Sequence, residues 1–294
     1  MTLKQALDKG RAILIAKNIE DAPLECELLL RHALNISRVQ LYQDIEQKIS
    51  SKQEEIFWRL IERCLTGEPA AYIIGHREFY GLDFYVDSRV LIPRPETELL
   101  VEKALFLARK KTISAIADIG TGCGAIAISL APNLPQTRIY ATDISTPALE
   151  VALFNCRKHG VADRVCLLHG DLLDPLPEPV DLIIANLPYI NEGELTKSLL
   201  NFEPGLALNG GSDGLERIRR LCHQVGEKLN IEGSLLLEVG QGQAAAVSAL
   251  LHSLFPSAEV EVTPDLGGID RVVSCTHTRS RLENQRVYLT HKLL

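Results

Sequence analysis

The sequence lacks a long apolar segment, which argues against a membrane-spanning helix. Its longest apolar stretch, residues 115–132, is interrupted by Asp118, Thr121 and several glycines. The first residues carry charged side chains and show neither a continuous apolar core nor a small-residue cleavage site, so we predict no secretory signal. From these absences we expect a cytoplasmic protein that does not bind a membrane.

Few residues are arranged for metal or covalent chemistry. The seven cysteines are odd in number, are scattered and include no C-x-x-C pair, which argues against a disulfide framework and a structural zinc site. The eight histidines form no H-E-x-x-H motif, and no serine lies in a nucleophile elbow. We therefore expect reduced, mostly buried thiols, no metal and no acyl-transfer chemistry.

An excess of positive charge is also absent. The formal net charge is −7 at pH 7, so we expect no broad basic surface and no direct contact with nucleic acid. Hydrophobic residues make up 46% of the chain and charged residues 23%, which is typical of a globular protein and excludes long disordered regions. A length of 294 residues is enough for one large or two modest domains.

The N-terminal part has the pattern of a small helical unit. Apolar residues recur at intervals of three and four from Leu3 to about Thr66, and Gly67 marks the end of the last helix. Phe57 and Trp58 lie at helical spacing and are expected in the core of this unit. From Tyr72 to Val86, β-branched and aromatic residues around two glycines predict a short hairpin.

After Pro93, short apolar runs alternate with helical stretches. A strand followed by a helix, repeated, predicts an α/β fold with a doubly wound, mostly parallel sheet covered by helices on both faces. At the end of the chain, two strands joined near Gly267 are expected to form an antiparallel pair. The expected strands are 114–119, 138–142, 165–169, 180–185 and 234–239, and the expected helices are about 97–110, 124–131, 146–159, 213–229 and 241–254.

A glycine-rich loop follows the first of these strands. Residues 116–125 read I-A-D-I-G-T-G-C-G-A and place Gly120, Gly122 and Gly124 between an apolar strand and an apolar helix. Glycine allows a tight turn and lets a ligand approach the backbone. The spelling also satisfies the dinucleotide pattern G-x-G-x-x-A, so the glycines alone do not identify the ligand.

Three acidic residues narrow the choice of cofactor. Asp143 ends the second strand, where a carboxylate can accept hydrogen bonds from ribose hydroxyls of either cofactor. Asp118 precedes the first glycine by two residues, a position that suits an ammonium group better than a pyrophosphate. Asp171 follows the third strand and could accept from an adenine amino group. Together these acids favour S-adenosylmethionine.

The fourth strand runs directly into Asn186-Leu187-Pro188-Tyr189. In open parallel sheets, ligands bind at the carboxyl ends of strands. An asparagine side-chain oxygen and a backbone carbonyl can accept both N–H bonds of an NH₂ group, and a tyrosine ring can stack on the plane of that group. This combination suits a substrate with a flat, weakly nucleophilic nitrogen.

These motifs resemble those of a known enzyme family. Residues 118–124 resemble the first motif of class I methyltransferases, and residues 186–189 resemble the N-P-P-Y motif of enzymes that methylate amide or exocyclic amino nitrogens. The stretches 91–98 and 203–208, the latter followed by residues 210–215, look like the release-factor glutamine methyltransferase family. The resemblance covers about residues 3–275.

The resemblance implies a class I methyltransferase fold with a seven-stranded sheet, preceded by a small helical domain. It implies methyl transfer from S-adenosylmethionine to the side-chain amide of the glutamine in the Gly-Gly-Gln motif of peptide-chain release factors, which would be the protein partners of a monomeric enzyme. The expected divisions are 1–70 as a helical substrate-recognition domain, 71–92 as a hairpin linker, 93–276 as the methyltransferase domain and 277–294 as a tail.

The resemblance also implies the site residues. The implied cofactor-binding residues are Asp118, Gly120, Thr121, Gly122, Cys123, Gly124, Asp143, Asp171, Leu172 and Asn186. The implied catalytic residues are Asn186, Leu187, Pro188 and Tyr189. These four also count as substrate-binding, together with Arg94 and Glu96, which could equally form ion pairs at a domain joint.

Leu187 departs from the pattern, since it stands where the family usually has a first proline. N-L-P-Y is also the spelling found in ribosomal RNA adenine dimethyltransferases, but the net charge of −7, the helical domain and the E-P-x-x-A-L stretch argue against that function. Glutamine methylation of a ribosomal protein and a role as a catalytically silent binding module are two further functions that the sequence leaves open. Glu238 ends a buried strand, where we expect it to act as a cap.

Overall fold

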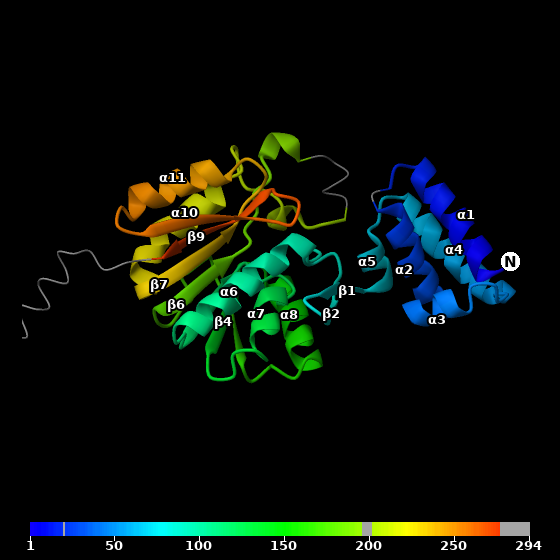
Figure 1. Cartoon of the computed structure of the whole chain (residues 1–294), viewed down its shortest axis with the longest axis horizontal. Coiled ribbons are helices and arrows are strands. Elements are labelled where there is room, and N and C mark those ends of the chain that lie inside the picture. The colour runs from blue at the N-terminus through cyan, green and yellow to red at the C-terminus, as the bar shows by residue number, and fades with distance from the viewer. Residues whose placement is uncertain (20, 196–201, 277–294) are drawn as a thin grey trace, which may run out of the picture. The chain divides into compact units, whose positions relative to one another are not determined.

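The computed structural model describes residues 1–19, 21–195 and 202–276 (Figure 1). The chain divides into two compact units. The first consists mainly of Met1–Arg77, and the second contains most of the described chain from Glu78 onward. The tail expected at 277–294 lies outside the described residues.

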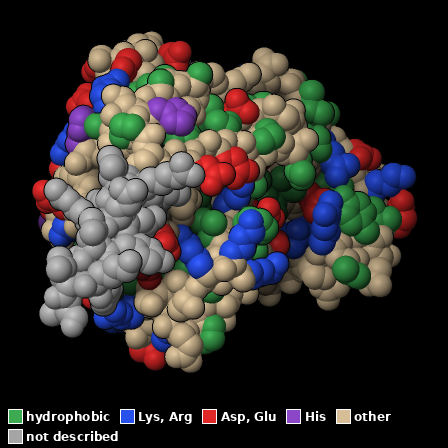
Figure 2. Space-filling view, turned by 60° about the vertical axis from the view of Figure 1, so that its left-hand side comes forward, with side chains coloured by type: hydrophobic (Ala, Val, Ile, Leu, Met, Phe, Trp, Pro, Cys, Tyr) green, Lys and Arg blue, Asp and Glu red, His purple; other side chains and the backbone are tan. Residues whose placement is uncertain are grey.

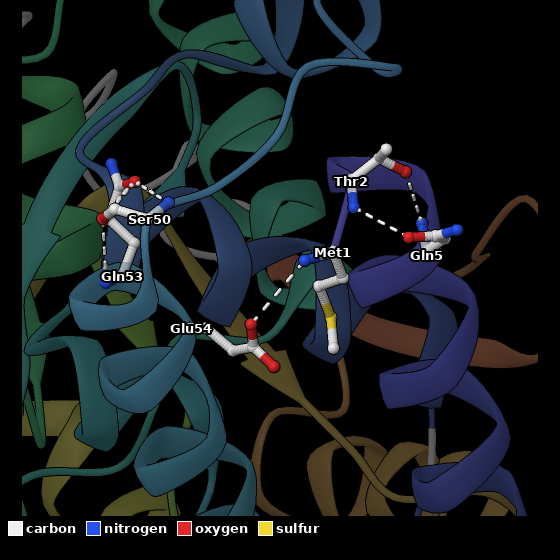
Figure 3. A network of polar contacts seen from close by, with 6 residues as sticks. All are labelled: Met1, Thr2, Gln5, Ser50, Gln53 and Glu54. Carbon is white, nitrogen blue, oxygen red and sulfur yellow. Dashed lines mark hydrogen bonds and ion pairs between the residues drawn. The ribbon is translucent and has the colours of Figure 1, made fainter.

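The first unit is helical, as the apolar spacing predicts. Three of its helices begin with a capping box, in which a serine or threonine side chain and a glutamine side chain bind each other's backbone N–H groups. Figure 3 shows two of these boxes, Thr2 with Gln5 and Ser50 with Gln53. The helices are α1 (Leu3–Ala16), α2 (Ala22–Leu34), α3 (Arg38–Gln43), α4 (Ser51–Leu65) and α5 (Ala70–Ile74).

The core of the first unit consists of buried apolar side chains. Phe57 is fully buried, as expected, whereas Trp58 lies partly exposed against the edge of the core. The chain of this unit continues through α5, so the hairpin expected from Tyr72 is shorter than predicted. Ala70 and Ala71 favour a helix, and Gly75, with φ +77°, ends it. The hairpin consists of β1 (His76–Phe79) and β2 (Leu82–Tyr85).

The second unit is built on one seven-stranded sheet, which confirms the expected fold class. The strand order is β5-β4-β3-β6-β7-β9-β8. The five strands β3 to β7 pair in parallel, and β9 joins β7 and β8 in antiparallel register. The strands are β3 (Ala115–Ile119), β4 (Arg138–Asp143), β5 (Val165–His169), β6 (Val180–Ala185), β7 (Leu229–Glu238), β8 (Glu259–Pro264) and β9 (Asp270–Thr276).

Helices cover both faces of this sheet (Figure 1). One face packs against α10 and α11 through residues such as Leu221 and Leu251, which share a buried cluster with the sheet. The other face carries α6, α7 and α8. The helices are η1 (Pro95–Thr97), α6 (Glu98–Lys110), α7 (Ala125–Leu130), α8 (Thr146–Lys158), η2 (Glu192–Glu194), η3 (Gly205–Ala207), α10 (Glu216–Lys228) and α11 (Ala244–Leu254).

At β3 the chain changes the direction in which it adds strands to the sheet. The chain passes from β3 outward through β4 to β5 and then returns to β6 on the opposite side of β3. At such a switch point the connections leave in opposite directions, so a crevice opens at the carboxyl ends of β3 and β6. The glycine loop and the loop after β6 both begin there, which places the two main sequence motifs side by side.

Three element boundaries differ from the predicted ones by three residues or more. The helix expected from residue 241 begins at Ala244, because residues 241 and 242 form a turn in which Gly242 has φ +84°. The helix expected from residue 213 begins at Glu216, because residues 211–214 form a turn that ends on Gly214 with φ +73°. The strand expected from residue 234 begins at Leu229, because α10 leads directly into β7. Ser145 caps α8 as predicted, since its hydroxyl accepts a hydrogen bond of 3.2 Å from the N–H of Ala148. Within the described ranges, no helix has the length and apolar character that crossing a membrane requires.

Asn155 ties three segments of the second unit together. Its side chain is fully buried, and its Nδ2 donates to the carbonyls of Tyr85 (3.0 Å) and Cys123 (2.9 Å). Its Oδ1 accepts from the N–H of Tyr85 at 2.8 Å. One side chain on α8 therefore satisfies backbone groups of β2 and of the glycine loop.

Asn155→Ala is expected to lower the free energy of unfolding of the second unit by about 2–4 kcal/mol, because it leaves buried backbone groups without partners. Asn230→Ala is the matched control, since Asn230 is exposed and its amide bonds only Asp181 at the surface. A loss below about 1 kcal/mol is expected there. Urea titrations of both variants measure the difference, and equal losses would contradict the role given to Asn155.

Candidate active site

A pocket lies at the carboxyl ends of the central strands of the second unit. It is formed by the loops that follow β3, β4, β5 and β6, together with two further segments, around Val90 and Leu206, and with Arg217 of α10, all in the same unit. Its lining residues are Arg89, Val90, Leu91, Gly120, Gly122, Thr142, Asp143, Ile144, Ser145, Ala148, Gly170, Asp171, Leu172, Asn186, Leu187, Pro188, Pro204, Leu206, Ala207 and Arg217.

The glycine loop forms one wall of the pocket. Its first N–H groups, of Gly120 and Thr121, both donate to the carbonyl of Thr142 at 2.9 Å, which holds the loop against β4. Gly122 has φ +56°, and no atom lies within 4 Å of the place where a Cβ would stand. The backbone is therefore open toward the pocket at Gly122, so a ligand can approach it closely.

Asp118 lies behind this loop and is almost completely buried, with 1% of its surface exposed. Its Oδ2 accepts from the Thr121 hydroxyl at 2.6 Å and from the N–H of Ala127 at 3.2 Å. Its Oδ1 has no hydrogen-bond partner among the described residues. Burial raises the pKa of Asp118 to about 6, although the two hydrogen bonds oppose the rise. The unpartnered oxygen fits a cationic group.

Asp143 joins the glycine loop to the start of α8. Its Oδ2 accepts from the N–H of Gly122 and its Oδ1 from the N–H of Ser145, both at 2.9 Å. Burial raises the pKa of Asp143, while these backbone hydrogen bonds lower it. Because each carboxylate oxygen has two lone pairs, Asp143 can still accept from a ligand.

The far end of the pocket is shaped by the segment after β5. Asp171 is ion-paired with Arg220, and both partners are only partly exposed. Leu172 adopts the left-handed region with φ +49°, which is uncommon for leucine. In this conformation Leu172 belongs both to the pocket wall and to the buried cluster of the sheet.

The loop after β6 forms the opposite wall. The Nδ2 of Asn186 donates to the Thr97 hydroxyl at 3.0 Å, so the amide is held from behind. Leu187 is 5% exposed, belongs to the sheet's buried cluster and packs against Gly120. Burial of the leucine side chain thus holds the loop at the position where the family usually has proline.

Further contacts hold this loop in place. Gly210 packs so closely that a Cβ there would lie 2.8 Å from both the Pro188 carbonyl oxygen and the Tyr189 Cα. The N–H of Gly210 donates to the Ile190 carbonyl at 2.9 Å, and Gln243 Nε2 donates to the Tyr189 carbonyl at 2.9 Å. The backbone of the loop is therefore braced by neighbouring segments along its whole length.

Tyr189, Arg94 and Glu96 do not line the pocket itself. Burial raises the pKa of Tyr189 to about 12, so its hydroxyl stays protonated at physiological pH. Arg94 pairs with buried Glu203 at 2.7 Å, and the same carboxylate accepts from the N–H of Ile92 at 3.3 Å. Glu203 thereby joins the segment that contains Val90 and Leu91 to the one that contains Pro204 and Leu206, which builds the pocket's third wall.

Glu238 does not act as the cap that the sequence suggested. Its carboxyl is 2% exposed and faces Thr97 and Asn186, whose hydrogen bonding lowers its pKa. Burial has the larger effect and raises the pKa of Glu238 to about 7. The chain turns away after β7, so the side chain remains under the loop after β6 instead of at a helix end.

The pocket brings together most, but not all, of the predicted site residues. Thr121, Cys123, Gly124 and Asp118 lie behind the glycine loop and shape it. The residues that sequence reasoning missed are of two kinds. Thr142, Ile144, Ser145, Ala148 and Gly170 are close in sequence to the predicted acids and could have been found by extending those motifs. Arg89, Val90, Leu91, Pro204, Leu206, Ala207 and Arg217 reach the pocket only through tertiary packing.

The sheet order, the glycine loop after β3 and the polar loop after β6 define a class I methyltransferase. Residues 5–75 match the PrmC N-terminal domain family, and residues 95–202 match the methyltransferase small domain family. The chain belongs to the release factor glutamine methyltransferase family.

Two curated relatives illustrate the match. The release factor glutamine methyltransferase of Moorella thermoacetica is 43% identical over 274 residues, which cover 92% of this chain and 97% of the relative. That of Neisseria gonorrhoeae is 43% identical over 254 residues, with 85% and 91% covered. A solved methyltransferase from Pyrococcus furiosus shares the fold at a TM-score of 0.52 and 17% identity, covering 74% of this chain and 98% of that structure.

Asp118→Asn is expected to change how stability depends on pH. Because the folded pKa is about 6 and the ordinary value is 3.8, the folded wild type binds more protons than the unfolded chain between these pH values. The wild type therefore loses stability as pH rises through this window. The melting temperature of the variant minus that of wild type should rise from pH 4 to 6 and then stay constant.

Asp181→Asn provides a control of opposite sign. Burial raises the pKa of Asp181, but hydrogen bonds from Asn230 and from two backbone N–H groups outweigh it, so the net shift is downward. The same melting-temperature difference should then fall, not rise, with increasing pH in the acid range. A difference for Asp118→Asn that is flat from pH 4 to 8 would contradict the buried, unpartnered carboxylate.

Proposed function

We propose that this chain transfers a methyl group from S-adenosylmethionine to the side-chain amide nitrogen of the glutamine in the Gly-Gly-Gln motif of peptide-chain release factors. The observation that carries the proposal is which atom of the Asn186 side-chain amide is already hydrogen-bonded. Its amide stands in the pocket wall with Nδ2 already donated to Thr97. Its Oδ1 is therefore the available acceptor, which is what an incoming NH₂ group requires.

The residues around the pocket fit the methyl donor. We assign the glycine loop and its acids, with Leu172, to cofactor binding: the unpartnered Oδ1 of Asp118 for the ammonium, Asp143 for the ribose and Asp171 with Leu172 for the adenine. Gly122 provides open backbone and Gly120 a close contact with Leu187, while Thr121, Cys123 and Gly124 hold the turn. When bound, S-adenosylmethionine supplies an electrophilic methyl group on a sulfonium.

An amide nitrogen is a weak nucleophile because its lone pair is delocalised into the carbonyl. In our proposal, Asn186 Oδ1 and the Leu187 carbonyl accept the two N–H bonds and so orient the nitrogen toward the methyl group. Tyr189 holds the plane of the amide. Orientation and charge complementarity provide most of the rate enhancement. The bound cofactor would supply the methyl group, and the nitrogen that these residues orient would release one proton to water after methylation.

We assign Pro188 to stiffening the loop, and Arg94 and Glu96 to the approach of the protein substrate. The resemblance of residues 91–98 to the family supports this assignment. The ion pair of Arg94 with Glu203 also places the guanidinium beside the pocket wall. We further propose that residues 1–70 recognise the substrate, that 71–92 link them to the methyltransferase domain at 93–276, and that 277–294 form a tail.

We also propose that the enzyme acts as a monomer in the cytoplasm, without direct contact to nucleic acid. The net charge of −7 supports the last point. On the face shown in Figure 2, basic and acidic side chains occur side by side. Several of the chain's charged residues pair, such as Arg138 with Glu178 and Arg89 with Glu150, both at 3.0 Å.

Asn186→Ala is expected to lower the turnover number by at least about 100-fold, because the amide nitrogen is no longer oriented. Its Kd for S-adenosylmethionine should stay within about threefold of wild type, which isothermal titration calorimetry can measure. Asn133→Ala is the matched control, since that amide bonds only the Ser129 carbonyl in α7 and lies outside the pocket. Near-normal turnover of Asn186→Ala would contradict the assignment.

The substrate is tested by incubating the protein and labelled cofactor with purified release factor, ribosomes or bare RNA. Label is expected in the release factor, and it should be lost when the glutamine of Gly-Gly-Gln is replaced by asparagine. Label in a ribosomal protein or in RNA would instead identify that molecule as the methyl acceptor. Cofactor binding without transfer to any of them would favour a silent binding module.

A further inference from the structure

A buried carboxyl lies directly beneath the loop that holds Asn186. In the parallel pairing of β6 with β7, Ala185 is opposite Leu237, so Asn186, which directly follows β6, lies beside Glu238, the last residue of β7. Glu238 is 2% exposed and does not line the pocket. Its Oε2 has no hydrogen-bond partner within the described part of the chain. An acid in such a place costs stability, and no contact to a ligand accounts for it.

Thr97 connects this carboxyl to Asn186. It lies where η1 runs into α6, with helical backbone angles (φ −66°, ψ −20°), and its side chain makes no cap hydrogen bond. Its hydroxyl oxygen accepts from Asn186 Nδ2 at 3.0 Å, and both the hydroxyl and the Asn186 amide interact with Glu238. The hydroxyl therefore lies between the two side chains.

The direction of these hydrogen bonds follows from the chemistry of the groups. An ionised carboxylate can only accept, so the single proton of the Thr97 hydroxyl points toward Glu238. The hydroxyl oxygen must then accept, and only the NH₂ end of the Asn186 amide can donate to it. The Oδ1 of Asn186 is consequently left for the pocket. With a neutral partner in place of the carboxylate, the hydroxyl could turn and the amide could present either end.

We propose that Glu238 is a positioning residue that acts through Thr97, and directly on the amide, to keep Asn186 in the orientation that accepts the substrate NH₂ group. The proposal rests on the proposed function, because it explains how the acceptor needed for amide methylation is selected. It accounts both for the buried position of the acid and for the hydrogen bond that Asn186 Nδ2 donates to Thr97.

Other charged groups around Glu238 determine how it responds to pH. Arg271 on β9 favours the ionised form and Glu96 in η1 disfavours it, and Tyr189 above it stays neutral. Arg271 is already paired with Asp265 at 3.0 Å, so it does not fully neutralise Glu238. Burial is the largest influence and raises the pKa of Glu238 to about 7. The carboxylate is therefore protonated as pH falls through about 7.

Glu238→Gln and Thr97→Val are expected to lower kcat by about 10- to 100-fold, because the amide samples both orientations. Thr97→Ser keeps the hydroxyl and should retain at least about half of the wild-type kcat. In all three variants the Kd for S-adenosylmethionine should stay within about twofold of wild type. Thr137→Val is the matched control, since its hydroxyl is equally buried but bonds the Ile113 carbonyl away from the site.

The pH profile separates positioning from mere structural support. At saturating cofactor and substrate, wild-type kcat should fall below a midpoint near pH 7, and this fall should be absent in Glu238→Gln. Asp118 also titrates in the acid range, but its protonation weakens cofactor binding and appears in KM for the cofactor, not in kcat at saturation.

A second measurement does not require activity. In full-length protein carrying ¹⁵N-asparagine, the side-chain amide resonances of Asn186, assigned by their absence in Asn186→Ala, should shift with a midpoint near pH 7. The shift should disappear in Glu238→Gln, become smaller in Thr97→Val and persist in Thr97→Ser and Thr137→Val.

The outcomes distinguish the two proposals. If wild type fails to methylate release factor, the proposed function fails, and the Asn186 resonances still decide whether Glu238 controls the amide. The positioning role is overturned if these resonances do not respond to pH. It is equally overturned if Glu238→Gln keeps the wild-type kcat and pH profile, or if its loss of kcat matches that of Thr137→Val.

Discussion

The site depends on the burial of carboxylates at one edge of a parallel sheet. Asp118 lies one residue before the end of β3, and Asp143 and Glu238 are the last residues of β4 and β7. Desolvation is the main cause of the raised pKa in each. Each charge is only partly compensated, by hydroxyls and backbone N–H groups from nearby loops. The fold keeps these unfavourable groups because the surrounding strands and helices supply enough apolar packing to hold them in place.

The same edge also explains why the loops are rigid. The glycine loop is tied to β4 through the Thr142 carbonyl, and Asn155 holds it to α8. On the other side, Leu187 belongs to the loop after β6 and its side chain is buried. Gly210 packs against the backbone of the same loop. The two walls of the pocket, one with open backbone at Gly122 and one that carries Asn186, are thus each anchored in the core. Orientation of a weak nucleophile requires this kind of preorganisation.

Much of this arrangement was predictable, since local signals carried it. The alternation of apolar runs and helical stretches predicted the class of sheet, and the glycines between Ile119 and Ala125 predicted the turn. The predicted boundaries at residues 213 and 234 were wrong. A turn that ends on Gly214 and a direct passage from helix to strand gave no clear sequence signal at these positions. In the sequence, Leu187 stands where the family usually has a rigid proline. In the structure, the leucine side chain anchors the loop by packing.

The sequence by itself determined the order of the elements, the turn at the glycines and the presence of acids and an amide at strand ends, because periodicity and turn chemistry are local properties. Only the tertiary structure decided which of those polar groups lose their water and which partners they find. Glu238 looked like a cap until the return of the chain to β6 and β7 set it beside Asn186. Strand order and crossover, not the residue type, made an isolated acid part of the site.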